Sequence, residues 1–150
     1  MKISIGSDHR GRDAALHLEK RLRDAGHEIV VMAVPEAGEI GDYPDAASVV
    51  GRSVAGGGSE RGILICGTGL GMSIAANKVN GVRAATAHDE ITAELSRSHL
   101  DANVCCLSAD LLGARLIEKI VDRWLAIEFE GGRHQRRIEK ISAIEAGEDG

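Results

Sequence analysis

The chain has 150 residues, of which 43% are hydrophobic and 27% charged, with a formal net charge of −5 at pH 7. This length and composition predict one globular domain over residues 1–150 and exclude an intrinsically disordered chain. The negative charge argues against nucleic acid as a partner. The sequence contains no run of about 18 apolar residues, so no membrane span is expected.

Cysteine usage and the first residues bear on the cellular compartment. The three cysteines cannot all pair, and Cys105 and Cys106 are adjacent within an apolar run, so no disulfide framework is expected. Met1 and Lys2 lead into an apolar stretch that is too short for a signal peptide. Both observations favour a cytoplasmic protein. The Cys and His spacing typical of a zinc site is missing, so no metal is expected.

Short β-branched runs alternate with amphipathic segments along the whole chain. In the first amphipathic segment Ala15, Leu18 and Leu22 share one helical face, and Gly26 is a plausible stop. Strands are predicted over 3–6, 28–32, 62–66, 82–85 and 103–107, and helices over 12–25, 43–55, 72–78, 88–98, 111–127 and 133–146.

This alternation predicts an α/β fold, with helices on both faces of a five-stranded parallel sheet. Aromatic residues are only 2% of the chain, so the core must consist mainly of Ile, Leu, Val and Ala. Ligands of such sheets bind at the carboxyl ends of the strands, where the loops meet. We therefore expect the site at residues 7–9, at residues 66–71 and in the turn after Leu107.

The strongest local motif is the glycine-rich loop that follows the strand over 62–66. Gly67, Gly69 and Gly71 alternate there, which lets the backbone approach a ligand closely. Their N–H groups and the start of the next helix predict an anion-binding loop, whereas a tight turn without a ligand is the alternative. The motif has neither the ending of a P-loop nor the spacing of a dinucleotide-binding loop, so no nucleotide cofactor is expected.

Cys66 ends the strand and is expected to face this loop. Amide groups and the helix dipole at such a position stabilise a thiolate, the nucleophilic form of the side chain. The alternative is a small buried apolar residue, which is our interpretation of Cys105 and Cys106. Asp8 and His9 follow the first strand and should reach the same crevice, although such a pair is also common in plain turns.

Three basic side chains in the last third of the chain are further candidates. His99 closes the helix over 88–98, where a histidine also simply favours a helix C-terminus. Arg133 and Arg137 are four residues apart on the last helix and share a face. They could bind a phosphate through charge-assisted hydrogen bonds or remain solvated charges.

Together these features resemble the ribose-5-phosphate isomerase B / galactose-6-phosphate isomerase (RpiB/LacAB) family over nearly the whole chain. The resemblance rests on residues 6–9, 42–44, 62–69, 74–78 and 130–137. It implies a Rossmann-like three-layer α/β/α sandwich and an obligate homodimer with its sites at the subunit interface. It also implies interconversion of an aldose phosphate and a ketose phosphate without a metal or cofactor.

Carried onto this sequence, the resemblance makes Cys66 the base that takes the proton from C2 and returns it at C1. Thr68 would help to move the hydroxyl proton, and the amides of the loop from Gly67 through Gly69 to Gly71 would stabilise the cis-enediolate.

The resemblance also implies residues for ring opening and binding. His99 would protonate the furanose oxygen while Asp8 receives the anomeric proton. Tyr43 would line the sugar pocket. The phosphate would be held by His9, Arg133 and Arg137, with some groups supplied by the partner subunit.

Two positions depart from the family pattern and leave the substrate open. Leu100 stands where the family usually has asparagine, and Asp110 where it usually has an arginine near the phosphate. An acid beside a phosphate dianion costs about 1 kcal/mol or more. The substrate is therefore either ribose 5-phosphate or another sugar or sugar phosphate, such as a tetrose or hexose. A non-catalytic sugar-phosphate-binding module is the third interpretation, although binding alone needs neither the thiol nor the histidine.

The C-terminal helix suggests dimerisation on grounds of its own. It follows Gly131 and Gly132, and its Ile138, Ile141 and Ile144 need an apolar partner. In so short a chain that partner is either the rest of the chain or a neighbouring subunit. We expect a homodimer, which could in turn pair into a tetramer.

Overall fold

The computed structural model describes residues 1–148, and Asp149 and Gly150, the end of the predicted domain, lie outside the described residues. Strands and helices alternate along the chain as predicted. The strands are β1 (Lys2–Ser7), β2 (Glu28–Ala33), β3 (Arg61–Cys66), β4 (Ala84–Thr86) and β5 (Val104–Ser108). The helices are α1 (Arg12–Asp24), α2 (Tyr43–Ala55), α3 (Leu70–Ala76), α4 (Glu90–Ser98), α5 (Ala114–Ala126) and α6 (Arg133–Glu145).

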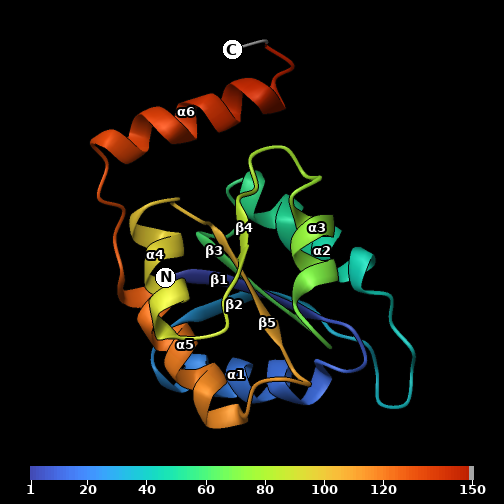
Figure 1. Ribbon diagram of the computed structural model, residues 1–150. Helices are drawn as coiled ribbons and strands as arrows, with labels where there is room; N and C mark the ends of the chain where they lie inside the picture. The colour runs from blue at the N-terminus through green and yellow to red at the C-terminus, as the bar shows by residue number, and fades with distance from the viewer. Residues whose placement is uncertain (149–150) are drawn as a thin grey trace.

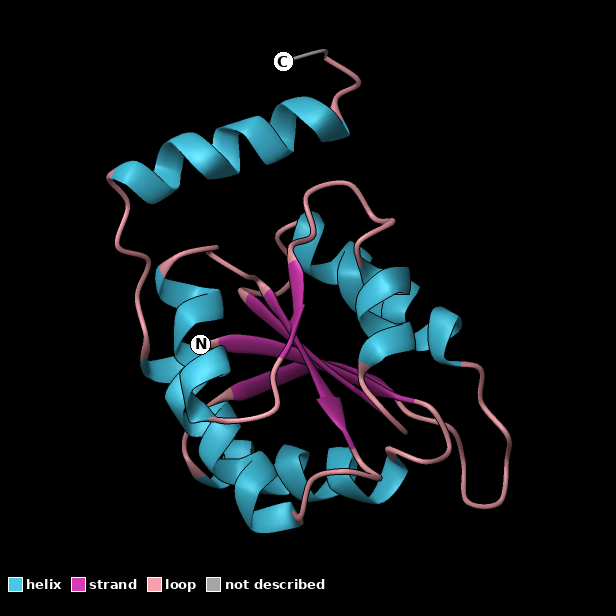
Figure 2. Ribbon diagram, in the orientation of Figure 1, coloured by secondary structure: helices cyan, strands magenta, loops and turns pink. Residues whose placement is uncertain are grey.

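The five strands form one sheet in the order β2-β1-β3-β5-β4, and each neighbouring pair is parallel. Helices α1, α4 and α5 cover one face of the sheet, and α2 and α3 cover the other (Figures 1 and 2). The predicted three-layer α/β/α sandwich is confirmed. Helix α6 is set apart from these layers, beyond an extended segment (Figure 1).

The two faces of the sheet bury different kinds of core. The core under α1, α4 and α5 contains Trp124, the largest fully buried side chain among the described residues. The core under α2 and α3 is built from smaller side chains, and α2 approaches the sheet closely. A Cβ at Gly62 would lie 2.8 Å from the Cγ1 of Val50, so only glycine fits there. Cys105 and Cys106 are both fully buried, as predicted.

Three helices begin elsewhere than the sequence predicts. Helix α4 starts at Glu90 rather than 88 because Asp89 caps it, accepting a 2.7 Å hydrogen bond from the Thr92 N–H. Helix α5 starts at Ala114 rather than 111, since the residues before it form a turn. Helix α3 starts two residues early, directly after Gly69, whose φ of 78° closes the glycine-rich loop.

Helix α6 is covered on one side only. Ile138 and His134 are buried, whereas Ile141 is 46% and Ile144 75% exposed. Two of the three isoleucines that require an apolar partner therefore lack one within the described chain. Among residues 1–148, no helix has the length and apolar character needed to cross a membrane.

Candidate functional site

Strands β1, β3 and β5 end side by side at the carboxyl edge of the sheet. The register pairs Ser7 with Ile65 and Cys66 with Ser108, so the loops after these three strands start at the same level. The backbone joins them further, because the N–H of Asp8 donates to the Ile65 carbonyl (3.2 Å). The predicted meeting of residues 7–9 with residues 66–71 is therefore present.

The thiol of Cys66 lies beneath the glycine-rich loop. The side chain is 4% exposed, and its Sγ accepts a hydrogen bond from the Gly69 N–H (3.2 Å). The left-handed conformation of Gly69 belongs to the tight turn that brings this amide over the sulfur. The Gly69 amide is thus a hydrogen-bond donor fixed on the sulfur. The hydroxyl of Thr68 is exposed just outside and accepts from the Leu70 N–H (3.3 Å).

The loop is held from two directions. The Oγ of Ser108 donates to the Gly67 carbonyl (2.6 Å), and the N–H of Asp110 donates to the same oxygen (3.1 Å). On the other side the ring of Tyr43 lies against Gly71, where a Cβ would come within 2.9 Å of it. The loop is thus fixed by β5 and by the first residue of α2. Sequence analysis singled out Tyr43 but not Ser108.

Asp8 serves both as a turn residue and as a candidate site residue. Its Oδ1 accepts from the N–H groups of Arg10 (2.9 Å) and Gly11 (3.0 Å). Its side chain is buried, and Oδ2 has no hydrogen-bond partner among residues 1–148. His9 is exposed, with Nδ1 3.3 Å from the Gly41 carbonyl oxygen. The predicted turn is present and leaves one carboxylate oxygen available.

His99 and the start of α6 lie at the opposite, amino edge of the sheet. Helix α4 connects the end of β4 to the start of its parallel neighbour β5. The last turn of the helix therefore lies at the amino edge. The N–H of Glu130 donates to the Ser98 carbonyl (3.0 Å), which draws the segment before α6 to the same place. There the rings of His99 and His134 stack, with their centroids 4.1 Å apart and an interplanar angle of 11°.

The predicted site residues thus form two groups separated by the length of the sheet. Four residue steps of β5 lie between the edges, which is roughly 13 Å along the strand. The carboxyl-edge group consists of Asp8, His9, Tyr43, Cys66, Gly67, Thr68, Gly69 and Gly71. The amino-edge group consists of His99, Arg133 and Arg137. Within one chain the structure does not bring the two groups together.

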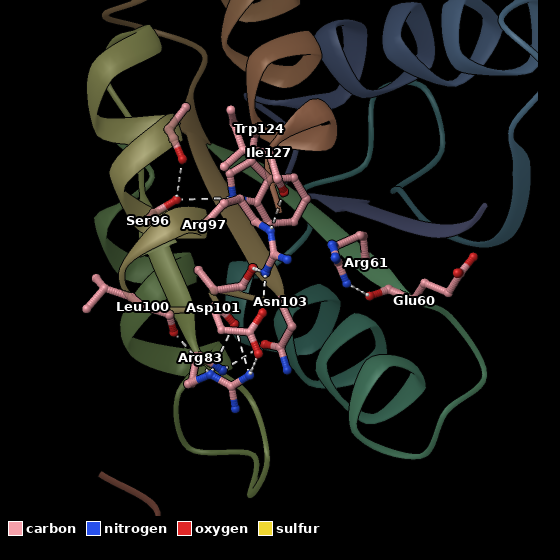
Figure 3. A network of polar contacts seen from close by, with 12 residues as sticks. Glu60, Arg61, Arg83, Ser96, Arg97, Leu100, Asp101, Asn103, Trp124 and Ile127 are labelled. Atoms are coloured by element: carbon pink, nitrogen blue, oxygen red, sulfur yellow. Dashed lines mark hydrogen bonds and ion pairs between the residues drawn. The ribbon is translucent and has the colours of Figure 1, made fainter. Parts of the chain in front are cut away.

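Two arginines that sequence analysis missed fix the turn that carries His99 (Figure 3). Arg97 is 1% exposed, and its Nη1 donates to the Ala102 carbonyl (2.7 Å) and to Asp101 Oδ1 (2.8 Å). Arg83 binds the other carboxylate oxygen of Asp101 (2.8 Å) and its carbonyl. Asp101 has a φ of 45°, an unusual value for a residue with a side chain, and both arginines hold it there.

Among the described residues, the amino-edge cluster is the one group of three or more His, Cys, Asp or Glu side chains close enough together to ligate one metal ion. Ligand atoms of His99, Glu130 and His134 lie within 4.8 Å of one another. The two rings lie in separate, nearly parallel planes, so one ion cannot lie in both ring planes, where the nitrogen lone pairs point, and the pair does not suit a tetrahedral metal. Arg133 Nε also donates to His134 Nε2 (3.4 Å). Burial, then His99 and Arg133, lower the pKa of His134.

Arg10 is a further residue that sequence analysis missed at the carboxyl edge. Its Nε and Nη2 donate to the carboxylate of Asp110 at 2.8–3.1 Å. Both side chains lie against Gly67, where a Cβ would come within 2.8 Å of Asp110 Oδ2 and 3.3 Å of Arg10 Nε. Asp110 therefore does not present the unpaired negative charge that the sequence led us to expect. The signal that could have found Arg10 is its place directly after Asp8 and His9.

Comparison with known proteins gives consistent results. The sequence pattern of the ribose/galactose isomerase family matches residues 3–141. Ribose-5-phosphate isomerase B of Escherichia coli is 45% identical over 144 residues, covering 96% of each chain. D-erythrulose-4-phosphate isomerase of Pectobacterium atrosepticum is 39% identical over 145 residues, covering 97% of this chain and 95% of the relative.

A solved structure of a similar protein has the same fold. Ribose-5-phosphate isomerase B of Clostridium thermocellum superimposes with a TM-score of 0.93 at 45% identity, covering 98% of this chain and 99% of the other. Family pattern, sequence identity and fold agree over nearly the full length. This chain therefore belongs to the ribose/galactose isomerase family.

Proposed function

We propose that the protein interconverts ribose 5-phosphate and ribulose 5-phosphate through a cis-enediolate. The observation that carries this proposal is the Cys66 thiol beneath the glycine-rich loop, with the Gly69 amide directed at its sulfur (3.2 Å). The named activity of relatives at 45% identity supports the choice of sugar phosphate.

Proton transfer is assigned to the carboxyl-edge group. Abstraction of a proton next to a carbonyl needs a base near C2 and fixed donors at the developing oxyanion. Cys66 takes the proton from C2 and returns it at C1, and Thr68 helps to move the proton between the two oxygens. Amides of Gly67 and Gly71 are donors for the enediolate, while the Gly69 amide serves the sulfur.

Ring opening needs groups from both edges. His99 gives a proton to the furanose oxygen, and Asp8 takes the proton of the anomeric hydroxyl through its free carboxylate oxygen, so that the C1–O bond of the ring breaks and the carbonyl forms. The carboxylate of Glu130 lies 3.9 Å from His99 Nε2. Phosphate is bound by His9 together with Arg133 and Arg137.

A second copy of the chain would complete the site. In a two-fold dimer the amino-edge group of each copy can meet the carboxyl-edge group of the other, which gives two equivalent sites. A groove of about 550 Å³ beneath α6, lined in part by Leu100, Ile141 and Ile144, offers apolar surface for that contact. The exposed side chains of Leu70 and Ile74 on α3, beside the glycine-rich loop, are suitable occupants.

The state of the cysteines bears on the cellular compartment. Cys66, Cys105 and Cys106 are all free and buried, which suits a reducing environment. Together with the proposed sugar-phosphate substrate, this makes the cytoplasm the proposed location.

The test is turnover of ribose 5-phosphate, with solvent deuterium appearing at C2 of the recovered sugar. Replacement Cys66→Ala removes the base and is expected to lower kcat by about 10²–10⁴-fold. Cys105→Ala is the matched control, because that thiol is fully buried in the sheet and burial raises its pKa to about 12. Equal activity of Cys66→Ala and the control would refute the role of Cys66.

A tetrose phosphate is the second candidate substrate. The relative named D-erythrulose-4-phosphate isomerase supports it, as does Leu100 at a position where the family usually has a polar residue. The assay therefore also includes erythrose 4-phosphate, galactose 6-phosphate, allose 6-phosphate and the free sugars. Turnover of one of these alone would keep the mechanism and change the substrate, and no turnover at all would favour a binding module.

A further inference from the structure

We infer that Arg10, held in place by Asp110, binds the phosphate of the substrate at the carboxyl edge of the sheet. The inference deepens the proposed function and rests on it. Neither the glycine-rich loop nor the phosphate ligands assigned above include this side chain.

The side chain of Arg10 lies at the start of the glycine-rich loop. Arg10 follows Asp8 and His9 directly, and its backbone N–H donates to Asp8 Oδ1 (2.9 Å). A Cβ at Gly67 would lie 3.3 Å from both Cδ and Nε of Arg10. Gly67 is the first residue after Cys66, so the arginine stem covers the beginning of the glycine-rich loop.

The guanidinium of Arg10 is held in one orientation and still has N–H donors without a partner among residues 1–148. Nε and Nη2 form a fork on Asp110, which restricts rotation of the side chain before any ligand arrives. Nη1 has no hydrogen-bond partner among residues 1–148, and the side chain is 55% exposed. Asp110 is thus a positioning residue, and Arg10 keeps both N–H groups of Nη1 and one of Nη2 for an anion.

Negatively charged side chains surround Arg10 at the carboxyl edge of the sheet. Asp8, Asp42 and Asp110 place three carboxylates around the ends of the strands and the start of α2. A phosphate dianion would be repelled there unless cations offset these carboxylates, and Arg133 and Arg137 of the same chain lie at the opposite edge. Arg12, the next arginine, is turned toward the Pro35 carbonyl (3.0 Å) instead. Arg10 is therefore the guanidinium that the geometry leaves available.

The experiment measures two quantities, the KM for ribose 5-phosphate and the dissociation constant of inorganic phosphate. Arg10→Met keeps the length of the side chain and removes the charge. Both constants are expected to rise together by about tenfold or more, since a charged hydrogen bond is lost. The control Arg21→Met breaks an equivalent fork to Asp122, between α1 and α5 and away from the loops, and should leave both constants within about twofold.

Two further variants separate binding from a structural role. Arg10→Lys is expected to recover part of the affinity, because it restores the charge without the fork. Arg10→Met alone leaves Asp110 unpaired beside the phosphate, so the double variant with Asp110→Asn should bind phosphate more tightly than the single one. A pair that only stabilised the fold would produce neither result.

The outcomes distinguish this inference from the proposed activity. If the wild-type protein does not turn over ribose 5-phosphate, the proposed substrate fails, while titration with inorganic phosphate still tests Arg10. Equal phosphate binding by Arg10→Met and Arg21→Met, or no phosphate binding by the wild-type protein, would overturn the inference.

Discussion

The two edges of the sheet carry their site residues by different means. At the carboxyl edge the residues lie on ends of buried strands, and backbone groups fix them, as in the contact between Gly69 and Cys66. At the amino edge, ion pairs between side chains fix the turn that follows His99, and they join Asp101 to Arg83 and Arg97. Strand ends are positioned by the core itself, whereas the turn after the end of α4 is held by ion pairs.

The sharpest way to test this division is to damage one edge in each of two variants. Cys66→Ala removes the base, and a double variant His99→Ala with Arg137→Ala removes amino-edge groups. Each protein alone is expected to be nearly inactive. After unfolding and refolding as a mixture, half of the dimers are mixed, and each has one intact site, so about a quarter of the wild-type activity should return.

Recovered turnover of ribose 5-phosphate is the measurement, with separately refolded and then combined variants as the control. Failure to recover activity in mixed dimers verified by mass spectrometry would show that each site is completed within one chain.

A smaller effect is expected at the support of the amino edge. Arg97→Met leaves the Ala102 carbonyl without its donor and Asp101 with one arginine instead of two. The free energy of unfolding is expected to fall by about 3 kcal/mol, because a buried charged network is broken. Arg123→Met, which breaks an exposed pair with Glu94, should cost no more than about 1 kcal/mol.

Urea titration at one fixed protein concentration measures both losses. Alkylation of Cys66 in the folded Arg97→Met protein should proceed at the wild-type rate, since that thiol belongs to the other edge. A loss of stability no larger than that of Arg123→Met would show that the arginine contributes little.

The smallest expected effect concerns pH. The pKa of His134 is lowered by burial from its ordinary value of 6.5, so the unfolded chain binds the proton more readily than the folded one. The stability associated with neutral His134 is present above about pH 6.5 and is lost as the pH falls below it. In His134→Gln the urea midpoint should therefore fall less between about pH 7.5 and pH 5.5 than in the wild type.

Burial also lowers the pKa of His27, which makes His27→Gln a useful comparison. That variant should reduce the same pH dependence while leaving the pH profile of kcat/KM unchanged, because His27 belongs to neither group. An equally steep loss of stability in His134→Gln and the wild type would contradict this account.

Much of the fold could be predicted because hydrophobic periodicity and helix stop signals are local. The alternation of elements, the burial of Cys105 and Cys106, and the position of Cys66 at a strand end all followed from short stretches of sequence. The start of α4 was missed although its signal, Asp89 followed by Thr92, is also local.

Other features depend on contacts between distant residues. The bond from Arg10 to Asp110 joins side chains 100 positions apart, so no local pattern reveals it. The burial of Arg97 against Trp124 and Asp101 is equally remote from sequence patterning, since a lone arginine normally indicates an exposed position. Helix α6 is held at both ends by distant residues, through the Glu130 N–H on the Ser98 carbonyl and through Glu145, which accepts from the Gly81 N–H.

The position of α6 far from Cys66 has a consequence for how much enzyme a cell must hold. If each site is assembled from two chains, dilution does not simply reduce the number of sites in proportion, because it also dissociates them. The activity per milligram of protein would then decrease once the protein concentration is lower than the dissociation constant of the dimer. Expression level would govern both the amount of catalyst and the fraction of it that works.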